Sequence, residues 1–410
     1  MNIGNKRLTS ILLIVFIDLL GFSLILPLLP YYTETFNASA VVTGLLVASY
    51  AAAQLFGAPL LGRLSDRFGR RPILLISISG TFIGFMVLGF ANSLWMLFAS
   101  RIIDGFTGGN LNVAQAYITD ITDSKNRTRS LGFIGAAFGL GFIIGPVAGG
   151  FLSQWGYSIP AFTAAGIALA NLFLVSLWLP ESLPADMRSN SPENKPAVNI
   201  PAMFAALKRP FTGSLLITRL FFGLAFAILQ TIFSLYALTR FNLSAAQTGY
   251  ILTYVGVLSV FTQGFLVGRI ANRIREDILI AVSVAVMAIS LLGWALTPSI
   301  ALLIVVLAPI SLSGGLLNTL LSSTLTKTVD AGEMGGILGL SASIDSLTRL
   351  FAPILGGVLI GVLGAWAPGL FSSLILGGLT FYVWKKIVNH AAFKTNSGFL
   401  QVSDQMESGD

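Results

Sequence analysis

Ionisable residues lie inside long apolar segments of this 410-residue chain, where a charged side chain is costly in free energy. They include Asp18, Arg101, Asp104, Asp345 and Arg349. A buried carboxylate binds or releases a proton according to whether a cation or water reaches it. Asp18, Arg101 and Asp104 are therefore predicted to couple proton movement to a change of conformation.

A polar stripe runs along the segment 94–116. Its members recur at steps of three or four residues, which places them on one face of a helix: Arg101, Asp104, Gly108, Asn112 and Gln115. Lipid cannot satisfy polar groups, so this face must point into a cavity or against another helix. The predicted substrate cavity combines this stripe with later segments: Asn112, Gln115, Gln230, Tyr236, Asp345 and Arg349.

The same residues also allow a purely structural interpretation. Asp18 can neutralise Arg101, and Asp345 can pair with Arg349 one helical turn later, so that both pairs only fix helix packing. The Phe-rich stretch around Tyr236 is more typical of a packed core than of a ligand surface. The sequence leaves both interpretations open.

The composition determines which elements must position these residues. The chain is 55% hydrophobic and 10% charged, with a mean hydropathy of +0.84, whereas a soluble domain carries about 25% charged residues. Disorder, a coiled coil and a soluble enzyme are excluded. The absence of cysteine excludes disulfides and thiolate metal sites, and the sequence predicts no metal and no cofactor. No phosphate-binding loop of the Walker type occurs, so ATP is not the predicted energy source.

The apolar runs predict twelve membrane-spanning helices, at 8–30, 42–62, 73–92, 94–116, 131–153, 159–179, 211–237, 246–267, 278–297, 299–323, 336–360 and 365–388. Most of the 24 basic residues then fall on one side, which the positive-inside rule assigns to the cytoplasm together with both termini. Arg219 lies inside a predicted helix and is expected to extend to the inner surface. The prediction is a multi-pass protein of the cell (inner) membrane.

An internal repeat divides the chain. The string GGNLN at Gly108–Asn112 returns as GGLLN at Gly314–Asn318, and Pro146 returns as Pro353 at nearly the same spacing. The predicted organisation is an N-terminal six-helix half (1–180), a cytoplasmic linker (181–210), a C-terminal six-helix half (211–390) and a cytoplasmic tail (391–410). Two such halves around a mid-membrane site form one of the main transporter architectures.

The loop after the second predicted helix reads GRLSDRFGRRPILL from Gly62 to Leu75. A basic loop can serve only to set the topology. This pattern, however, resembles the signature loop of the major facilitator superfamily. The resemblance implies the superfamily's 12-helix, all-α membrane fold and a conformational latch on the cytoplasmic side. The latch residues are Gly62, Asp66, Arg67, Gly69, Arg70 and Arg71, with Asp120 as the acidic partner.

The stretch GFIIGPVAGG places small residues four apart, which allows close helix packing. Packing alone is the structural interpretation, but the stretch also resembles a motif of antiporters in the superfamily: Gly141, Gly145, Pro146, Gly149 and Gly150. With other stretches it is similar to the tetracycline efflux pumps among the drug and proton antiporters. Two positions differ, because those pumps carry an acid where this chain has Gly84 and a histidine where it has Ser259.

The sequence therefore predicts a proton-coupled antiporter that exports small amphipathic compounds by alternating access, as in multidrug efflux and antibiotic resistance. The expected partners are a small-molecule substrate, protons and membrane lipids, without nucleic acid, and the protein is expected to be a monomer. A lipid, glycolipid or sugar transporter of the same superfamily is the alternative. An enzyme is disfavoured, because the predicted helices hold no histidine, cysteine or metal-ligand cluster. The substrate is predicted to be neutral or cationic, because unpaired acids repel anions.

Overall fold

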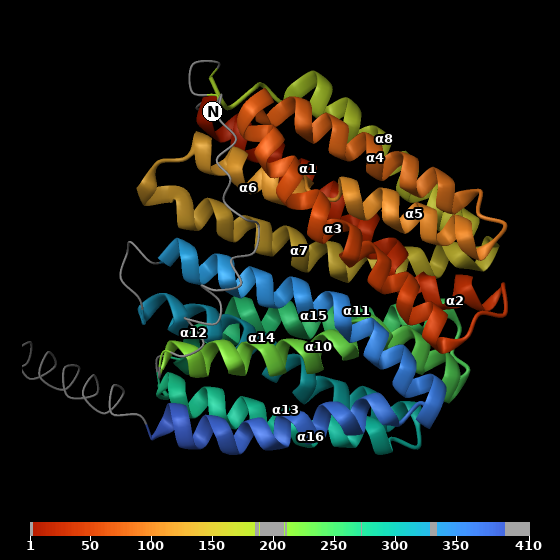
Figure 1. The fold of residues 1–410 in the computed structure, drawn as a ribbon, viewed down its shortest axis with the longest axis vertical. Helices are drawn as coiled ribbons and strands as arrows, with labels where there is room; N and C mark the ends of the chain where they lie inside the picture. Colours follow the sequence, from red (N-terminus) through yellow and green to blue (C-terminus); the bar gives the residue numbers. More distant parts are fainter. Residues whose placement is uncertain are drawn as a thin grey trace, which may run out of the picture. The chain divides into compact units, whose positions relative to one another are not determined.

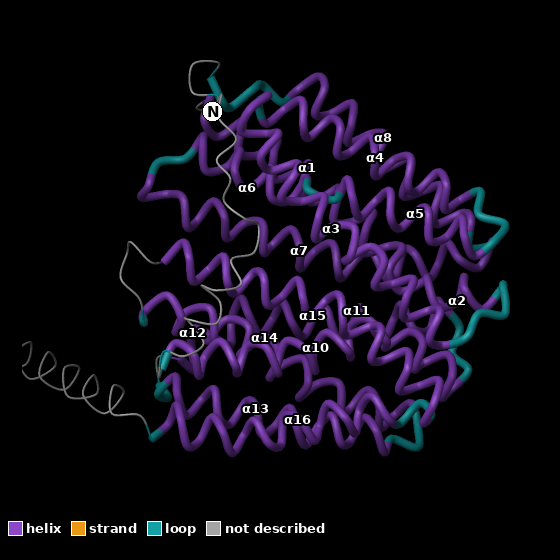
Figure 2. The backbone as a smooth tube through the Cα atoms, in the orientation of Figure 1, coloured by secondary structure: helices purple, strands orange, loops and turns teal. Residues whose placement is uncertain are grey.

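The computed structural model of the protein describes residues 3–184, 188, 209, 211–271, 273–328 and 334–389. The described elements are helices joined by short loops (Figures 1 and 2). Most of the predicted linker (181–210), Asn272 and the predicted tail (391–410) lie outside the described residues. The predicted all-α class is confirmed.

The first part of the chain holds the helices up to α8. Helix α1 (Ile3–Ile25) passes through a 3-10 turn (Leu26–Leu28) into α2 (Leu29–Glu34), because Pro27 and Pro30 each remove a backbone donor. The helices that follow are α3 (Ala40–Phe68), α4 (Arg70–Gly89), α5 (Leu94–Thr107), α6 (Asn110–Ile121), α7 (Ser124–Leu152) and α8 (Ser158–Trp178).

The second part begins with α10 (Thr212–Phe241) and α11 (Ala245–Phe261). A π-helical turn (Thr262–Leu266) joins α11 to the short α12 (Val267–Ala271). The remaining helices are α13 (Glu276–Leu296), α14 (Ile300–Lys327), α15 (Met334–Leu363) and α16 (Ala367–Val383), which ends in a second π-helical turn (Trp384–Val388).

Eleven helices of the described chain are long and apolar enough to cross a membrane. The predicted helix 94–116 is not among them, because the chain forms two shorter helices there, α5 and α6. The break falls at Gly108 and Gly109, and glycine has a low helix propensity. Counted as one interrupted crossing, α5 and α6 make the structure consistent with twelve crossings.

The described residues fall into two compact groups, called group A and group B here. Group A lies within 1–197, 227–260 and 349–368, and group B lies within 198–226, 261–348 and 369–410, so that α10 and α15 contribute to both. In group A, α1 packs against α7 and α8, α4 packs against α5 and α8, and α3 packs against α5. In group B, α13 packs against α14. The division into two six-helix halves stays a prediction.

Candidate functional site

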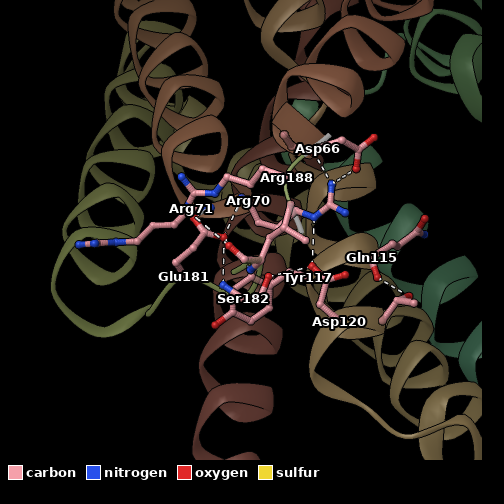
Figure 3. A network of polar contacts seen from close by, with 12 residues as sticks. Asp66, Arg70, Arg71, Gln115, Tyr117, Asp120, Glu181, Ser182 and Arg188 are labelled. Atoms are coloured by element: carbon pink, nitrogen blue, oxygen red, sulfur yellow. Dashed lines mark hydrogen bonds and ion pairs between the residues drawn. The ribbon is translucent and has the colours of Figure 1, made fainter. Parts of the chain in front are cut away.

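Two of the predicted latch residues, Asp66 and Asp120, contact the side chain of Arg70, which is 8% exposed (Figure 3). Its Nη1 atom donates to the Asp66 carboxylate at 2.5 Å and to the Ser65 hydroxyl at 2.7 Å, and its Nε atom donates to Asp120 at 3.1 Å. Gly69, with φ +104°, separates α3 from α4 by a single residue and brings these side chains together. We call Asp66, Arg70 and Asp120 the latch cluster. The expected contact between Asp120 and a loop arginine is confirmed, whereas its role in switching stays a prediction.

The other predicted latch residues lie outside this cluster. The Arg67 guanidinium lies over the ring of Phe68 at 5.3 Å from its centre. Arg71 donates to the backbone oxygen of Ser176 at 2.6 Å, at the end of α8. A Cβ added at Gly62 would meet no atom within 4 Å. Of the loop arginines, Arg70 is therefore the one whose side chain is held by two acids.

The sequence analysis missed three residues next to the latch cluster, all shown in Figure 3. Glu181 accepts from the backbone N–H groups of Arg70 and Arg71 at 2.9 and 3.1 Å. Ser182 donates its hydroxyl to Asp120 at 2.9 Å, and the Tyr117 hydroxyl donates to the backbone oxygen of Pro180 at 2.8 Å. The single available signal in the sequence was that Glu181 lies two residues after the end of the apolar segment 159–179.

Arg101 pairs with Asp104 of its own helix α5 at 3.2 Å, and both residues are buried. The expected partnership of Arg101 with Asp18 is therefore not found. The physical reason is that Asp104 lies three residues along the same helix and reaches the guanidinium without any movement of α1. The guanidinium also lies over the ring of Phe85, 5.5 Å from its centre.

Asp18 has no hydrogen-bond or ion-pair partner among the described residues. It lines a small cavity between α1, α4 and α6, together with Ile14, Val15, Leu74, Ile78, Asn110, Leu111 and Ala114. Asn110 is the first residue of α6, immediately after the break in the helix. The carboxylate therefore lies beside the interruption of α5 and α6.

The break itself is built into a polar contact with α3. The amide nitrogen of Gln54 donates to the backbone oxygen of Gly108 at 2.8 Å and lies 3.3 Å from the hydroxyl of Tyr50. The Ser77 hydroxyl donates to the backbone oxygen of Thr107. Two carbonyl groups that the break frees are thus satisfied by neighbouring helices. Beyond the break, the predicted cavity residues Asn112 and Gln115 are exposed.

A second ion pair lies in group B. Arg219 holds both carboxylate oxygens of Asp345, at 3.0 and 2.6 Å, and donates to the Ser322 hydroxyl at 3.0 Å. One expectation is corrected, because Asp345 pairs with Arg219 and not with Arg349. The expectation that Arg219 extends to the inner surface stays a prediction. The forked guanidinium matches the two carboxylate oxygens, which favours this contact between α10 and α15.

The two predicted cavity residues of α10 differ in their surroundings. Gln230 is exposed. Tyr236 is 1% exposed, and its ring lies 6.3 Å from that of Phe233 and 5.9 Å from that of Phe241. Neighbouring aromatic side chains thus enclose Tyr236 as part of the core, and its place in a substrate cavity stays a prediction.

The antiporter-like stretch uses one face of α7 against α1. A Cβ at Gly145 would overlap Ser23, and a Cβ at Gly149 would overlap the backbone of Leu24. A Cβ at Gly141 would be in ordinary contact with α1, at 3.4 Å from Leu19. These glycines permit the close approach of the two helices that small residues allow in lipid.

The other face of α7 meets α11 within group A. A Cβ at Gly249 of α11 would overlap the backbone oxygen of Pro146. A Cβ at Gly150 of α7 would lie 2.8 Å from the backbone oxygen of Ala245. Thr253 donates its hydroxyl to the backbone oxygen of Ile143 at 2.9 Å. We call this contact the α7–α11 gate contact.

The same kind of contact occurs between α15 and α3, again within group A. Pro353 and Gly357 are the repeat counterparts of Pro146 and Gly150. A Cβ at Gly44 of α3 would overlap the backbone oxygen of Pro353, and a Cβ at Gly357 would lie 2.6 Å from the backbone oxygen of Ala40. The internal repeat of the sequence therefore has a counterpart in helix packing.

In group B, the positions that correspond to Arg70 and Asp120 in the internal repeat also carry an ion pair. Its acid stands where Arg70 stands in the latch cluster, and its base stands close to the counterpart of Asp120. Glu276 begins α13 as Arg70 begins α4, and it accepts from Lys327 at 2.6 Å and from Thr324 at 3.1 Å. Lys327 ends α14 close to the counterpart of Asp120. Opposite charges thus join the start of α4 to α6 in group A, and the start of α13 to the end of α14 in group B.

Reversing this pair gives a first prediction. Glu276→Lys or Lys327→Glu alone places like charges together and should lower the free energy of unfolding by about 0.2–1 kcal/mol. The double exchange should recover the loss, as measured by thermal unfolding of the purified protein in detergent. A double variant no more stable than the two singles would contradict an attractive contact at this position.

The described residues include no group of three His, Cys, Asp or Glu side chains that can hold a metal ion. The fold and the site define a multi-pass membrane protein with ion pairs and an unpartnered acid along its apolar helices. The model of the Major Facilitator Superfamily matches residues 11–353, and the chain belongs to this superfamily.

Relatives extend this result over most of the chain. The chain is 35% identical over 379 residues to the tetracycline resistance protein, class H, of Pasteurella multocida, covering 89% of this chain and 92% of that protein. It is 30% identical over 402 residues to multidrug resistance protein 2 of Bacillus subtilis (strain 168), covering 95% and 98%.

Solved structures share the fold. The crystal structure of the human organic anion transporter MFSD10 matches with a TM-score of 0.69 at 24% identity, covering 93% of this chain and 100% of that one. The crystal structure of the nucleoside transporter NupG matches with a TM-score of 0.74 at 14% identity, covering 94% and 99%. The predicted membership of the superfamily and its fold class are confirmed.

Proposed function

We propose that the protein is a secondary active transporter that exports small amphipathic compounds in exchange for protons. It works by alternating access in the inner membrane, with both termini on the cytoplasmic side. Membership of the superfamily and the similarity to tetracycline and multidrug resistance proteins support this function.

The proposal of proton coupling rests on one observation. Asp18 lacks a partner among the described residues, while Arg101 and Asp104 form an ion pair with each other. An isolated acid within an apolar helix favours its protonated form, and it releases the proton once water or a cation reaches it. Asp18 therefore carries the proton. Arg101 and Asp104 act as a pair that opens or closes as the helices move.

The difference at Gly84 from the tetracycline pumps fits this assignment. A Cβ at Gly84 would lie 2.9 Å from the Cβ of Asp104 and 3.1 Å from the backbone oxygen of Ser100. No larger side chain fits there without a shift of α5 against α4. In this chain Asp104 supplies an acid at that contact from the opposite helix.

The direct test of the function uses inverted membrane vesicles from cells that express the chain. Uptake of a fluorescent amphipathic cation should follow an imposed proton gradient and stop when a protonophore removes the gradient. Vesicles without the chain are the control. Uptake that does not depend on the proton gradient but depends on a gradient of substrate would contradict the proposed exchange of substrate for protons.

The substrate class is a second prediction. We assign the polar groups of the cavity to Asn112, Gln115, Gln230, Asp345 and Arg349, while the unpaired acid Asp18 favours positive charge nearby. Expression in a drug-sensitive host should raise tolerance to lipophilic cations and neutral amphiphiles by more than to anions.

The comparison is the growth-inhibiting concentration for each charge class, with the Asp18→Asn variant as the matched control. If tolerance changes for no compound, while glycolipids or sugars raise the unfolding temperature of the purified protein, drug export is wrong. The glycolipid or sugar alternative then replaces it.

A further inference from the structure

The carboxylate of Glu181 contacts backbone atoms of α4 at its start, as Figure 3 shows. Its Oε1 atom accepts from the N–H of Arg70 at 2.9 Å, and its Oε2 atom accepts from the N–H of Arg71 at 3.1 Å. The first N–H groups of a helix have no partner within the helix, and the helix dipole favours a negative charge there. Glu181, which lies more than 100 residues further along the chain, thus satisfies two backbone N–H donors at the start of the 20-residue helix α4.

The residue before this helix is shaped by the same contact. A Cβ at Gly69 would lie 2.5 Å from the Oε2 atom of Glu181, and the φ of Gly69 is +104°. A side chain here would both strain the backbone and displace the carboxylate. The glycine of the signature loop therefore leaves room for Glu181 as well as turning the chain.

The segment that carries Glu181 is itself attached to the latch cluster. Ser182 donates to the Oδ2 atom of Asp120 at 2.9 Å, the same atom that accepts from Arg70 Nε at 3.1 Å. The buried Tyr117 of α6 donates to the backbone oxygen of Pro180 at 2.8 Å. The chain at 180–182 is thereby fixed to α4 and to α6 at once.

We propose that Glu181 is the positioning residue of the latch cluster, and that the start of the linker is a working part of the latch. Glu181 holds the backbone from which the Arg70 side chain extends, so that the guanidinium reaches Asp66 and Asp120 together. The loss of this carboxylate should loosen the start of α4 and release Arg70. The effect on transport rests on the proposed function, but the effect on Arg70 does not.

The first measurement is hydrogen exchange at the amides of Arg70 and Arg71 in the full chain. Glu181→Ala should accelerate their exchange about fivefold, since it removes a helix cap. Glu181→Gln keeps one acceptor oxygen and should give a smaller change. Asp123→Ala is the matched control, because Asp123 precedes α7 without a side-chain cap bond. Unchanged exchange in Glu181→Ala overturns the proposal.

The second measurement tests whether Arg70 moves, which a simple helix cap would not require. Ser65 is fully buried beneath the Arg70 guanidinium, and the chain has no cysteine of its own. In a Ser65→Cys background, Glu181→Ala should accelerate maleimide labelling of the new thiol several-fold, and Asp123→Ala should not. If Glu181→Ala accelerates amide exchange but leaves the labelling rate unchanged, Glu181 acts only as a helix cap, and the proposal is overturned.

Transport distinguishes this inference from the proposed function. Glu181→Ala should lower the turnover number and leave the apparent affinity for substrate unchanged, with Glu181→Gln between this variant and the wild type. Lost affinity at unchanged turnover overturns the positioning role. If the wild-type protein transports none of the tested compounds, the function is wrong, while the exchange and labelling results still decide the role of Glu181.

Discussion

Asp18→Asn should reduce uptake driven by a proton gradient to the level of vesicles without the protein. Asparagine has the shape of the carboxyl group but cannot carry a proton, and the buried acid Asp104 is already paired with Arg101. Exchange of labelled for unlabelled substrate across the membrane should continue, because it requires no net proton movement. Reconstituted vesicles measure both reactions on the same preparation.

The control for this variant is Glu34→Gln, at the exposed end of α2. Asp18 donates and accepts no hydrogen bond within the described chain, so Asp18→Asn should leave the unfolding temperature within about 2 °C of the wild type. Gradient-driven uptake at the wild-type rate in Asp18→Asn would remove this residue from the mechanism. Loss of both reactions in a folded protein would indicate a role in substrate binding.

Gly249→Leu should trap the transporter with the α7–α11 gate contact open. The added side chain would overlap the backbone oxygen of Pro146, where no flexible group can give way. Overpacking costs about 1–3 kcal/mol, so the population with this contact closed should fall at least about fivefold, and transport should fall with it. Gly166→Leu is the control, since a Cβ at Gly166 meets no atom within 4 Å.

A thiol at Thr253 reports the state of this contact, because Thr253 bonds to the backbone of Ile143 across it. Maleimide labelling of Thr253→Cys should be faster in the Gly249→Leu background than with Gly249 intact. Normal transport together with unchanged labelling would show that the two helices need not approach so closely during the cycle.

Local spacing was sufficient where a contact lies within one helix or one loop. Asp66 and Arg70 are four residues apart and meet across Gly69, and the signature pattern predicted the pair together with Asp120. The apolar runs predicted most membrane-spanning helices within a few residues. One exception is the predicted loop from Gly62 to Leu75, which is helical except at Gly69, because α3 continues to Phe68 and α4 begins at Arg70. The other is the segment 94–116, where the sequence showed Gly108 and Gly109 but not that neighbouring helices would satisfy the freed carbonyl groups.

The sequence by itself determined the all-α membrane class, the superfamily and the latch residues, because a chain in lipid must satisfy its backbone within apolar helices of fixed length. The tertiary structure decided which charges pair. Arg219 rather than Arg349 holds Asp345, and Glu181 reaches the start of α4 from a distant segment. Such contacts depend on how each helix is rotated and shifted against its neighbours, and the spacing of residues along one chain does not fix that rotation.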